Sequence, residues 1–507
     1  MYQPGSFEPF LLSPLDHTLP PVCPTLFLCF RLSEHQHYVS RLRRGIDIML
    51  LRLPFLYGEV VSCVDEKGRA GRMKVQFPSS SIEGISMLSI RHYPDKTLPS
   101  DQSRKDEHLH VQHEVANLDQ SYCPLAFITS PGEPGPVVRF QANILADGVL
   151  LSMSFNHQVA DATGPAIILE MLAQGCRDSS AEDAQILPSS CQSESRLREQ
   201  LSCIAHSLHS HQDWAYGPLA RNDTADDAST ASESETVLSD PDLKGLPFVF
   251  PPEKVVHLRD ICNSLLPILQ HEYQGSRNKS VHPSTHWPTF LSSNDVLISM
   301  ILFCIERVCF ENGREWSDSA GLCMAINLRS HLQPPLPNHY IGNVITVRRF
   351  PYSLQRDGLS LDQHMDTNLL AELPALVGEY ELFHIANIAF QVRAMINSTD
   401  DRYTRGYISY LNNQSGSYSA MSGLSGLLVT SWRHLPVYDL DFGPGIGKID
   451  HFESPPGMME GACIILPANK NVGGHGEPAS WDVRLMLKPE DMEGLVRDGL
   501  FQWALGG

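Results

Sequence analysis

Residues 152–164 read SMSFNHQVADATG, and they hold a histidine and an aspartate four residues apart, His157 and Asp161. The residues before them, from Val149 to Phe155, carry an apolar side chain at every second position. This period of two indicates a β-strand with one apolar face. Apolar residues at helical spacing follow, and Pro165 suits the first turn of a helix. The stretch therefore predicts a strand, a polar turn that carries both residues, and a helix.

A second apolar-rich segment, residues 136–145, precedes the strand. Asp147 and Gly148 join the two segments, and an Asp-Gly pair is a strong signal for a hairpin turn. His157 then lies on a turn at a strand end, where a rigid scaffold can hold a side chain and leave it accessible. His157 and Asp161 are either a catalytic pair, metal ligands or two polar residues of an ordinary turn, and the rest of the chain decides between these.

The chain has 507 residues, 42% of them hydrophobic and 19% charged, which is ordinary for a globular protein with large cores. Its formal net charge is −20, from 58 acidic and 38 basic residues. Binding to nucleic acid or to an anionic membrane needs a basic surface, so this charge argues against both. A small anionic ligand is still compatible with it, because a local basic pocket can form in an acidic protein.

The twelve cysteines are scattered without any Cys-x-x-Cys pair, so neither a zinc ribbon nor a thioredoxin-type motif is indicated. No HExxH motif occurs either, and we expect no metal site. The N-terminal residues lack the charged and apolar regions of a signal peptide, and no run of about 18 apolar residues could form a membrane span. We therefore expect a cytoplasmic protein with reduced thiols and no membrane span.

A change in composition divides the chain. Residues 201–245 are rich in Ser, Asp, Glu and Ala and predict an acidic, flexible crossover linker. Residues 1–200 and 246–507 then form an N-terminal and a C-terminal domain.

The second half again predicts helices and strands in alternation. Residues 292–313 predict a capped helix, with Ser293 or Asn294 as its N-cap and Gly313 as its C-cap. Residues 321–330 predict a buried strand.

The pattern His157-x-x-x-Asp161 resembles the HxxxD motif of the BAHD acyltransferases, which transfer acyl groups from coenzyme A thioesters to alcohols or amines. The motif alone is short, but the resemblance covers nearly the whole chain and keeps the order of the family's segments. The chain most resembles fungal members, including trichothecene-type acetyltransferases. The other segments that carry the resemblance are LSPLDH (12–17), LPFLYGEV (53–60), SSNDVL (292–297), INLRSHLQPPLPNHYIGNVI (326–345), TSWRHLPVYDLDFGPG (430–445) and DVRLMLKPEDMEGL (482–495).

The resemblance implies an α/β fold of two similar domains like chloramphenicol acetyltransferase, each a mixed β-sheet flanked by helices, with a channel between them. It implies an acyl-CoA donor, acetyl-CoA foremost, and no permanently bound cofactor. The acceptor is expected to be a hydroxyl group, less often an amine, of a small fungal-type secondary metabolite. We expect a monomer that binds these two small molecules and no nucleic acid.

Acyl transfer from a thioester needs a base that takes the acceptor's proton during attack. Histidine, with an ordinary pKa of about 6.5, is suited to this role near neutral pH. We expect direct attack with His157 as the base and no covalent acyl-enzyme. The resemblance implies that Asp161 points away from the acceptor and pairs with an arginine, and Arg329 is the candidate partner.

Two positions depart from the family's pattern. Ala162 follows the motif aspartate where glycine is usual, and glycine arrives only at Gly164. Pro444 stands in the second motif where many members carry tryptophan. Proline has no amide hydrogen, so a donor to the oxyanion must come from elsewhere.

Asp441 in that second motif has two interpretations. It is a second carboxylate in the site, or it belongs to a buried ion pair that fixes a loop turned by Gly443 and Gly445, which we favour. Ser431 and Trp432 either line the channel or are ordinary strand residues. The candidates for binding the donor's phosphates are Arg348, Arg349 and Lys470.

Two other functions are compatible with the sequence. A free-standing condensation-type domain shares this fold and uses a carrier-bound donor with an HHxxxD motif, but Asn156 occupies the position of the first histidine. A non-catalytic relative would bind a small molecule or a protein partner. The intact His157 and Asp161 argue against that function, whereas Ala162 and Pro444 argue slightly for it.

Overall fold

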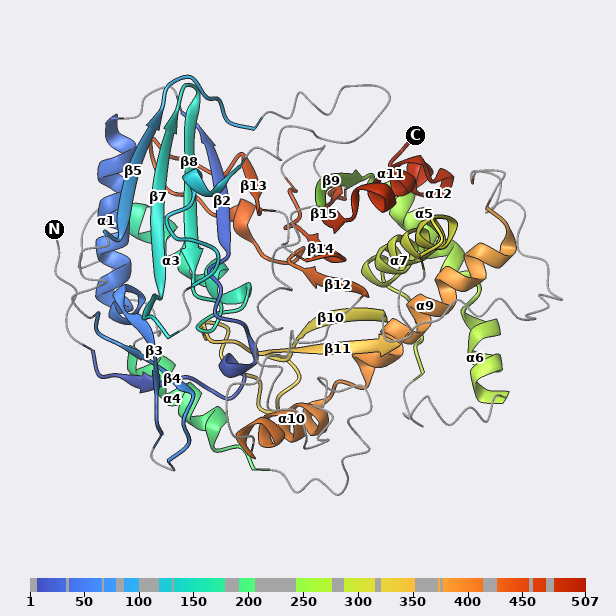
Figure 1. Ribbon diagram of the computed structural model, residues 1–507, viewed down its shortest axis with the longest axis horizontal. Helices are drawn as coiled ribbons and strands as arrows, with labels where there is room; N and C mark the ends of the chain where they lie inside the picture. Colours follow the sequence, from blue (N-terminus) through green and yellow to red (C-terminus); the bar gives the residue numbers. More distant parts are fainter. Residues whose placement is uncertain are drawn as a thin grey trace.

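Two lobes lie side by side, and each contains a β-sheet with helices packed on it (Figure 1). The elements from β1 to α4 build the first lobe, and those from β9 to α12 build the second, apart from β13 and η8, which pack with the first lobe. The two similar α/β domains predicted from the sequence are thus confirmed. The computed structural model describes residues 7–32, 36–65, 68–78, 86–99, 118–129, 132–177, 191–205, 243–275, 287–314, 321–351, 373, 377–413, 426–455, 459–470 and 478–507.

The main sheet of the first lobe contains the predicted hairpin. Its two strands pair antiparallel, with Val138 opposite Phe155 and Ile144 opposite Val149. The carboxylate of Asp147 in the turn accepts a hydrogen bond from the backbone N–H of Leu98 at 2.8 Å. The strand order is β13-β2-β8-β7-β5. The strands are β2 (Thr25–Arg31), β5 (Leu88–Tyr93), β7 (Val138–Leu145), β8 (Gly148–Phe155) and β13 (His451–Glu453).

Helices α1 (Gln36–Arg52) and α3 (Thr163–Arg177) pack on the sheet's apolar face. The alternating side chains of β8 that predicted this face, among them Leu151 and Met153, are fully buried there. The two helices approach closely because glycines meet between them. A Cβ atom on Gly45 would lie only 2.4 Å from the sulfur of Cys176. Burial of this apolar surface is the main stabilising contribution to the lobe.

A smaller sheet and one further helix complete the first lobe. Its strand order is β1-β4-β3-β6. The strands are β1 (Phe10–Leu11), β3 (Glu59–Cys63), β4 (Arg72–Gln76) and β6 (Gly135–Pro136), and α4 (Cys191–Ser202) contacts β1. Short 3-10 helices are η1 (Asp16–Thr18), η2 (Pro54–Tyr57) and η5 (Gln120–Tyr122).

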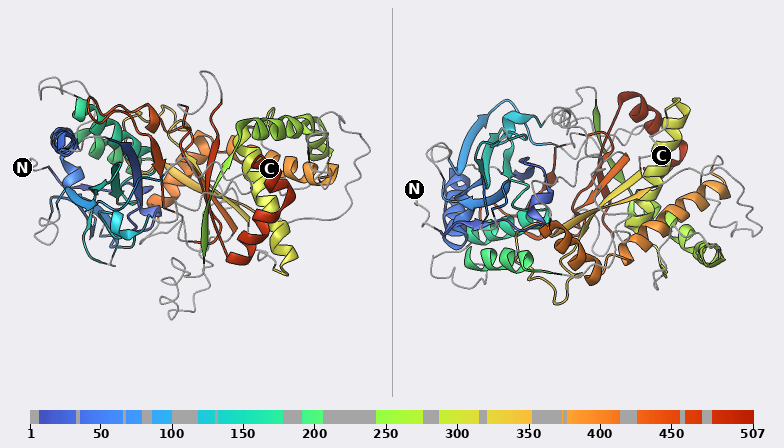
Figure 2. Two further views of the ribbon diagram at one scale, coloured as in Figure 1. Left: turned by 90° about the horizontal axis from the view of Figure 1, so that it is seen from above. Right: turned by 60° about the horizontal axis from the view of Figure 1, so that its bottom comes forward.

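The second lobe has a mixed sheet in the order β11-β10-β12-β14-β15-β9. β12 runs parallel to β10 and β14, and the other neighbours are antiparallel. Its helices gather mainly on the side of the sheet away from the first lobe (Figure 2). The strands are β9 (Lys244–Phe250), β10 (Gly321–Asn327), β11 (Ile345–Pro351), β12 (Gly426–Ser431), β14 (Ala462–Ile465) and β15 (Trp481–Leu487). The helices are α5 (Pro252–Ser264), α6 (Leu266–Gly275), α7 (Ser293–Glu311), α9 (Glu379–Asn397), α10 (Asp401–Asn413), α11 (Pro489–Arg497) and α12 (Gly499–Ala504). The 3-10 helix η8 (Val437–Asp439) packs against α3 and β13 of the first lobe instead.

The predicted N-caps of α7, Ser293 or Asn294, lie one or two residues after the observed one, and the predicted C-cap Gly313 lies one residue after the observed C-cap. Ser292 is the N-cap, and it forms a capping box with Asp295. This arrangement satisfies two backbone N–H groups at the helix start. At the other end Asn312 is the C-cap, and Gly313 follows it with a φ of +68°. Glycine belongs there because other residues rarely adopt a positive φ.

The chain does not keep the two lobes' sheets strictly separate. Residues of β13, which lie in the predicted C-terminal domain, pair antiparallel with β2 in the first lobe. Glu453 of β13 forms a buried ion pair with Arg484 of β15, with Oε1 and Nε 2.6 Å apart. The second half therefore reaches into the first lobe. Most of the predicted linker, residues 206–242, lies outside the described residues.

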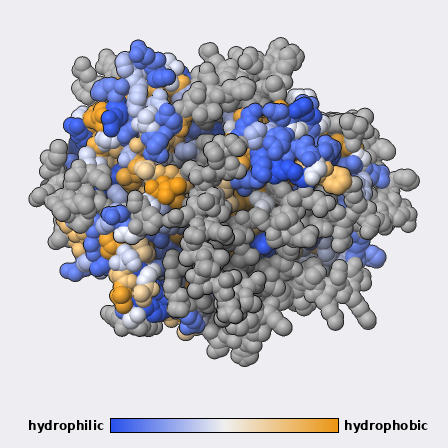
Figure 3. Space-filling view, viewed as in Figure 1, coloured by the Kyte–Doolittle hydropathy of each residue, from blue (hydrophilic) through white to orange (hydrophobic). Residues whose placement is uncertain are grey.

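The surface over α11 is strongly hydrophilic (Figure 3). Within the described ranges, no helix is long and apolar enough to cross a membrane. In the same part of the chain, no three His, Cys, Asp or Glu side chains are grouped so that they could hold a metal ion.

Candidate active site

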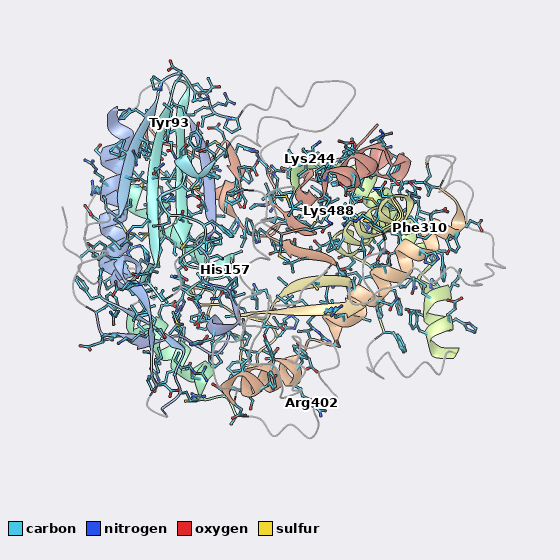
Figure 4. All side chains as sticks on the ribbon, viewed as in Figure 1. Tyr93, His157, Lys244, Phe310, Arg402 and Lys488 are labelled. Carbon is cyan, nitrogen blue, oxygen red and sulfur yellow. The ribbon has the colours of Figure 1, made fainter. Side chains whose placement is uncertain are left out.

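His157 lies where the two lobes meet (Figure 4). β8 ends at Phe155 and α3 begins at Thr163, so the predicted order of strand, turn and helix is confirmed. The backbone N–H of His157 donates to the carbonyl of Val22 at 2.9 Å, which fixes the start of the turn. The side chain is half-buried.

The imidazole of His157 is held in one tautomer. Nδ1 lies 3.0 Å from the carbonyl oxygen of Ala160. A carbonyl only accepts hydrogen bonds, so Nδ1 carries the proton and Nε2 of the neutral ring keeps a free electron pair. No side chain in the described ranges bonds to Nε2. The ring is therefore arranged to accept a proton at Nε2.

The surroundings of His157 shift its pKa in opposite directions. Burial lowers the pKa, because the interior disfavours the charged ring. The carbonyls of Ala160 and of His157 itself, and the carboxylate of Asp161, raise it. The net result is a pKa below the ordinary value, so the ring stays neutral, and able to act as a base, at neutral pH.

Asp161 has its carboxylate fully engaged in the structure. Oδ2 accepts hydrogen bonds from Nη1 of Arg329 at 2.9 Å and from the backbone N–H of Val344 at 2.8 Å. Oδ1 accepts from the N–H of Thr163 at 3.0 Å, at the start of α3. The pairing with Arg329 that was expected from the sequence is present. Because Arg329 and Val344 belong to the second lobe, Asp161 ties the turn to that lobe.

A steric constraint explains why glycine occupies position 164, shortly after the HxxxD motif. A Cβ atom on Gly164 would lie 2.4 Å from the carbonyl oxygen of Ile341 and 2.7 Å from Cβ of Ala160. Ala162 is half-buried, and its φ is not positive, so its backbone does not require glycine. The close approach between the start of α3 and the second lobe therefore depends on Gly164.

A buried charged cluster lies behind the turn, and sequence reasoning missed it. Arg198 of α4 lies 2.7 Å from Glu194 and 3.3 Å from Asp16, and all three side chains are at most 1% exposed. Asp16 accepts two hydrogen bonds from Asn343 of the second lobe. Asp16 and Asn343 lie in segments that carry the family resemblance, but no local pattern shows that they meet.

The DFGPG loop lies at the far end of α3 from His157. Arg177, the last residue of α3, donates a hydrogen bond to the carbonyl of Asp441. Since α3 has 15 residues, its two ends are about 20 Å apart. Asp441 is therefore not a second carboxylate beside His157, and the exposed Pro444 is equally remote from the imidazole.

The expected ion pair of Asp441 is not found among the described residues. Its carboxylate instead accepts a hydrogen bond from the backbone N–H of Gly443 at 2.9 Å, within its own loop. Gly443 and Gly445 have φ values of +85° and +82°, so they do provide the predicted turn. Asp441 is half-buried and holds its loop through this turn, so the predicted buried ion pair does not describe its contacts.

Arg348 does not fit its expected role as a phosphate ligand. Its side chain is 7% exposed, and Nη1 donates to Ser398 and Thr399 at 3.0 Å each. The guanidinium also stacks 4.5 Å from the ring centre of Tyr403. The alternation of a strand does not reveal which of Arg348 and Arg349 is buried, and Arg349 is the more exposed of the two.

Ser431 ends β12 and Trp432 follows it, next to Arg433 of a pocket that contains Lys470. Ser431 is exposed, and the indole N–H of Trp432 donates to Thr430 at 3.1 Å. The exposed Lys470 lies in a pocket of about 330 Å³ whose other polar lining residues are Arg433, His434, Tyr438 and Asp439. The guanidinium of Arg433 is already held by two backbone carbonyls. Lys470 and His434 are thus the basic groups of the pocket with free surface.

Comparisons with known proteins agree with this geometry. Residues 24–176 match the "trichothecene 3-O-acetyltransferase-like N-terminal domain", and residues 368–501 match the "transferase family". Fumigaclavine B O-acetyltransferase easN of Aspergillus fumigatus is 37% identical over 506 residues, which cover 99% of this chain and 98% of that protein. The chain belongs to the BAHD-type transferase family. It is an acyltransferase, as the HxxxD motif predicted.

Two further comparisons extend over nearly the whole of this transferase. Fumigaclavine B O-acetyltransferase ifgI of Penicillium roqueforti is 30% identical over 504 residues, covering 98% of this chain and 97% of that protein. The crystal structure of F. graminearum TRI101 with coenzyme A and deoxynivalenol aligns with a TM-score of 0.69 at 18% identity. The alignment covers 98% of this transferase and 99% of that chain, which confirms the fold of both lobes.

Proposed function

We propose that this transferase moves an acetyl group from acetyl-CoA to a hydroxyl group of a small fungal-type metabolite, with His157 as the general base. The observation that carries the proposal is the hydrogen bond from Nδ1 of His157 to the carbonyl of Ala160. It leaves Nε2 unprotonated where the two lobes meet. The names of the relatives as O-acetyltransferases support the reaction type.

The reaction follows from this tautomer. Nε2 of His157 accepts the proton of the acceptor's hydroxyl as the oxygen attacks the thioester carbonyl. The tetrahedral intermediate then collapses, the C–S bond breaks, and the imidazolium returns the proton to the leaving thiolate. The products are an acetyl ester and free coenzyme A, and no acyl-enzyme forms. A positioned base of this kind contributes roughly 10²–10⁴ in rate.

Asp161 has no part in the proton transfer in this proposal. Its carboxylate is occupied by Arg329, Val344 and Thr163, so it holds the turn in place. The carbonyl of Ala160 stabilises the imidazolium that forms during the reaction, because it accepts the Nδ1 proton in both charge states.

For the donor, we propose that Lys470 binds a phosphate group of coenzyme A and that Ser431 and Trp432 line its path. Lys470 is an exposed ammonium in a pocket that also contains His434. Lys470, Arg433 and His434 outnumber the one acidic lining residue, Asp439, so in a chain of net charge −20 this pocket is a local exception to the acidic surface. Arg348 is excluded from this role by its burial and its hydrogen bonds.

For the acceptor, we propose fumigaclavine B as the first compound to test. Two relatives at 37% and 30% identity are named for O-acetylation of this compound. A condensation-type reaction is less well supported, because Asn156 stands where that motif has its first histidine. The side-chain oxygen of Asn156 accepts the backbone N–H of Gln158 at 3.0 Å, which is a structural role in the turn.

A free-thiol release assay tests the proposal. The purified chain is mixed with acetyl-CoA and with fumigaclavine B or other hydroxylated fungal metabolites, and products are identified by mass. We expect acceptor-dependent thiol release that is lost in His157→Ala and kept in His92→Ala, since His92 is an exposed residue of β5. Release that survives His157→Ala would exclude His157 as the base. Transfer from a carrier-bound thioester but not from acetyl-CoA would favour the condensation-type reaction.

A further inference from the structure

Asn343 connects a residue of the first lobe's N-terminal segment with the backbone of His157. It lies on the second lobe's loop between β10 and β11, and its side chain is fully buried. Its Nδ2 group lies 2.9 Å from Oδ1 of Asp16 and 3.0 Å from the carbonyl oxygen of His157. Its backbone N–H also donates to Oδ1 of Asp16 at 2.9 Å. An ionised carboxylate and a carbonyl only accept hydrogen bonds, so the amide nitrogen must face them.

Asp16, the anchor of Asn343, is itself fixed on both oxygens. Oδ2 accepts the backbone N–H of Ser13 at 2.8 Å and lies 3.3 Å from Nε of Arg198. Arg198 in turn donates through Nη2 to the carbonyl of Val159 at 3.0 Å. Through Arg198, Asp16 is therefore connected to the catalytic turn at a second carbonyl, that of Val159.

Three backbone carbonyls of the turn now have defined partners. The carbonyl of His157 is held by Asn343, and that of Val159 is held by Arg198. The carbonyl of Ala160 accepts from the imidazole itself. The plane of the peptide after His157 is thus set by a contact from outside the turn, and a second outside contact holds the carbonyl of Val159, next to the residue that accepts the Nδ1 proton. The contact through Asn343 is the one made by the second lobe.

We infer that Asn343 is a positioning residue that aims the Nε2 atom of His157 by holding the carbonyl of His157 against the Asp16 anchor. The inference rests on the proposed function, because only a base needs its ring aimed. Asn343 is fully buried, so it acts through the turn and not on a substrate. The charged groups that face the turn are Asp16 of η1, Glu194 and Arg198 of α4, Asp161 of the turn itself, and Arg329 after β10.

Asn343→Ala removes the side-chain contacts but keeps the backbone N–H that bonds to Asp16. We expect kcat to fall roughly 10–100-fold, since displacing a reacting group by about 1 Å costs up to about 10² in rate. KM values for both substrates should change less than about twofold. The imidazole should also lose part of the carbonyl support for its protonated form. The acid limb of the pH profile should therefore move to lower pH.

Asn143→Ala is the matched control. Asn143 of β7 is equally buried, and its side chain donates to the carbonyls of Tyr122 and Leu150 and to Ser152. None of these bonds reaches the turn. We expect Asn143→Ala to lower the free energy of unfolding. The acid limb of its pH profile and its kcat per folded molecule should match those of the wild type.

Two measurements decide the inference: steady-state kinetics from pH 5 to 8, and NMR titration of ¹⁵N-labelled histidine assigned with His157→Ala. The inference is supported if Asn343→Ala lowers kcat and shifts the titration of His157, and if Asn143→Ala does neither. Wild-type kcat, or a loss of kcat with unchanged titration, overturns it. If Asn343→Ala does not fold, Asn343→Ser is used, since its short side chain also ends the contact with His157. If the wild type shows no turnover, the proposed function fails, and the titration alone then decides whether Asn343 sets the state of the ring.

Discussion

Nη1 of Arg329 lies 2.9 Å from Oδ2 of Asp161, although 168 residues separate the two in the chain. Both side chains are buried, and Nη2 of Arg329 also donates to the carbonyl of Gly342 at 2.7 Å. The pair joins the turn of the first lobe to a loop of the second. Breaking a buried pair by removing one partner leaves the other charge without compensation, which is more costly than losing the attraction alone.

Asp161→Asn is therefore expected to lower the free energy of unfolding by about 3–5 kcal/mol. Arg329→Met should cost a similar amount, and the double variant should cost much less than the sum. Urea unfolding at pH 7 measures all three. Asp260→Asn is the control, because Asp260 pairs with Arg259 at the surface and such pairs contribute about 0–1 kcal/mol. If the double variant loses as much free energy of unfolding as the two single variants together, Asp161 and Arg329 are not coupled.

The pH dependence of activity follows from the lowered pKa of His157. The ring must be neutral to accept a proton, so activity is lost as the pH falls through that pKa. Burial places the pKa below the ordinary value of about 6.5. We expect kcat/KM to be level at neutral pH and to fall with a midpoint below about 6.5. The acid limb is measured from initial rates between pH 4.5 and 8.

Asp161→Asn provides a second check of this pKa. The carboxylate of Asp161 raises the pKa of His157, so its neutralisation should move the acid limb further toward low pH. Asp441→Asn should leave the limb in place, since Asp441 lies about 20 Å away at the other end of α3. A limb that moves equally in both variants would show that His157 is not the group being titrated.

Gly164→Ala tests the steric requirement after the motif. The added methyl group would meet the carbonyl of Ile341, and relieving this contact must displace backbone. We expect a loss of about 1–3 kcal/mol in the free energy of unfolding, together with a lower kcat because the loop that carries Asn343 shifts. Ala162→Gly, which restores the family's usual residue, should keep kcat within about twofold. Thermal unfolding and the thiol assay measure both variants.

The local features of this fold could be predicted from the sequence. The hairpin around Asp147 and the strand, turn and helix around His157 depend on residues near each other in the chain. Their side-chain period and turn chemistry are therefore visible in one window. Arg329 could be named as the partner of Asp161 only through the family resemblance, because no window of the sequence contains both.

The contacts between distant segments could not be predicted. Asn343 and Asp16 are 327 residues apart, and β13 joins the sheet of the other lobe. Asparagine and aspartate carry no sequence signal that identifies a distant contact partner. A strand of three residues, such as β13, is too short to show the alternating side-chain pattern of a strand. The burial of Arg348, which argues against a role as phosphate ligand, could not be predicted for a related reason. The elements packed over a strand decide which of its arginines is buried.

Glu453→Gln tests the contact by which β13 links the sheets of the two lobes. The guanidinium of Arg484 holds the pKa of Glu453 at about 2, against the burial that would raise it. The folded pKa is lower than the unfolded value of about 4.5. Glu453 therefore contributes stability that is fully present above about pH 4.5 and is lost as the pH falls toward 2. At pH 7 we expect Glu453→Gln to lower the free energy of unfolding by about 3–5 kcal/mol, because Arg484 remains buried without its anion.

The free energy of unfolding of Glu453→Gln should differ less from that of the wild type as the pH falls. A protonated glutamate resembles glutamine in charge and shape, so the two unfolding curves should converge between pH 4.5 and 2. Urea midpoints at several pH values measure this convergence. Glu493→Gln is the control, since Glu493 pairs with Arg497 on an exposed face of α11 and should give equal midpoints throughout. A difference between Glu453→Gln and the wild type that stays constant down to pH 3 would mean that the pair does not hold Glu453 in its ionised form.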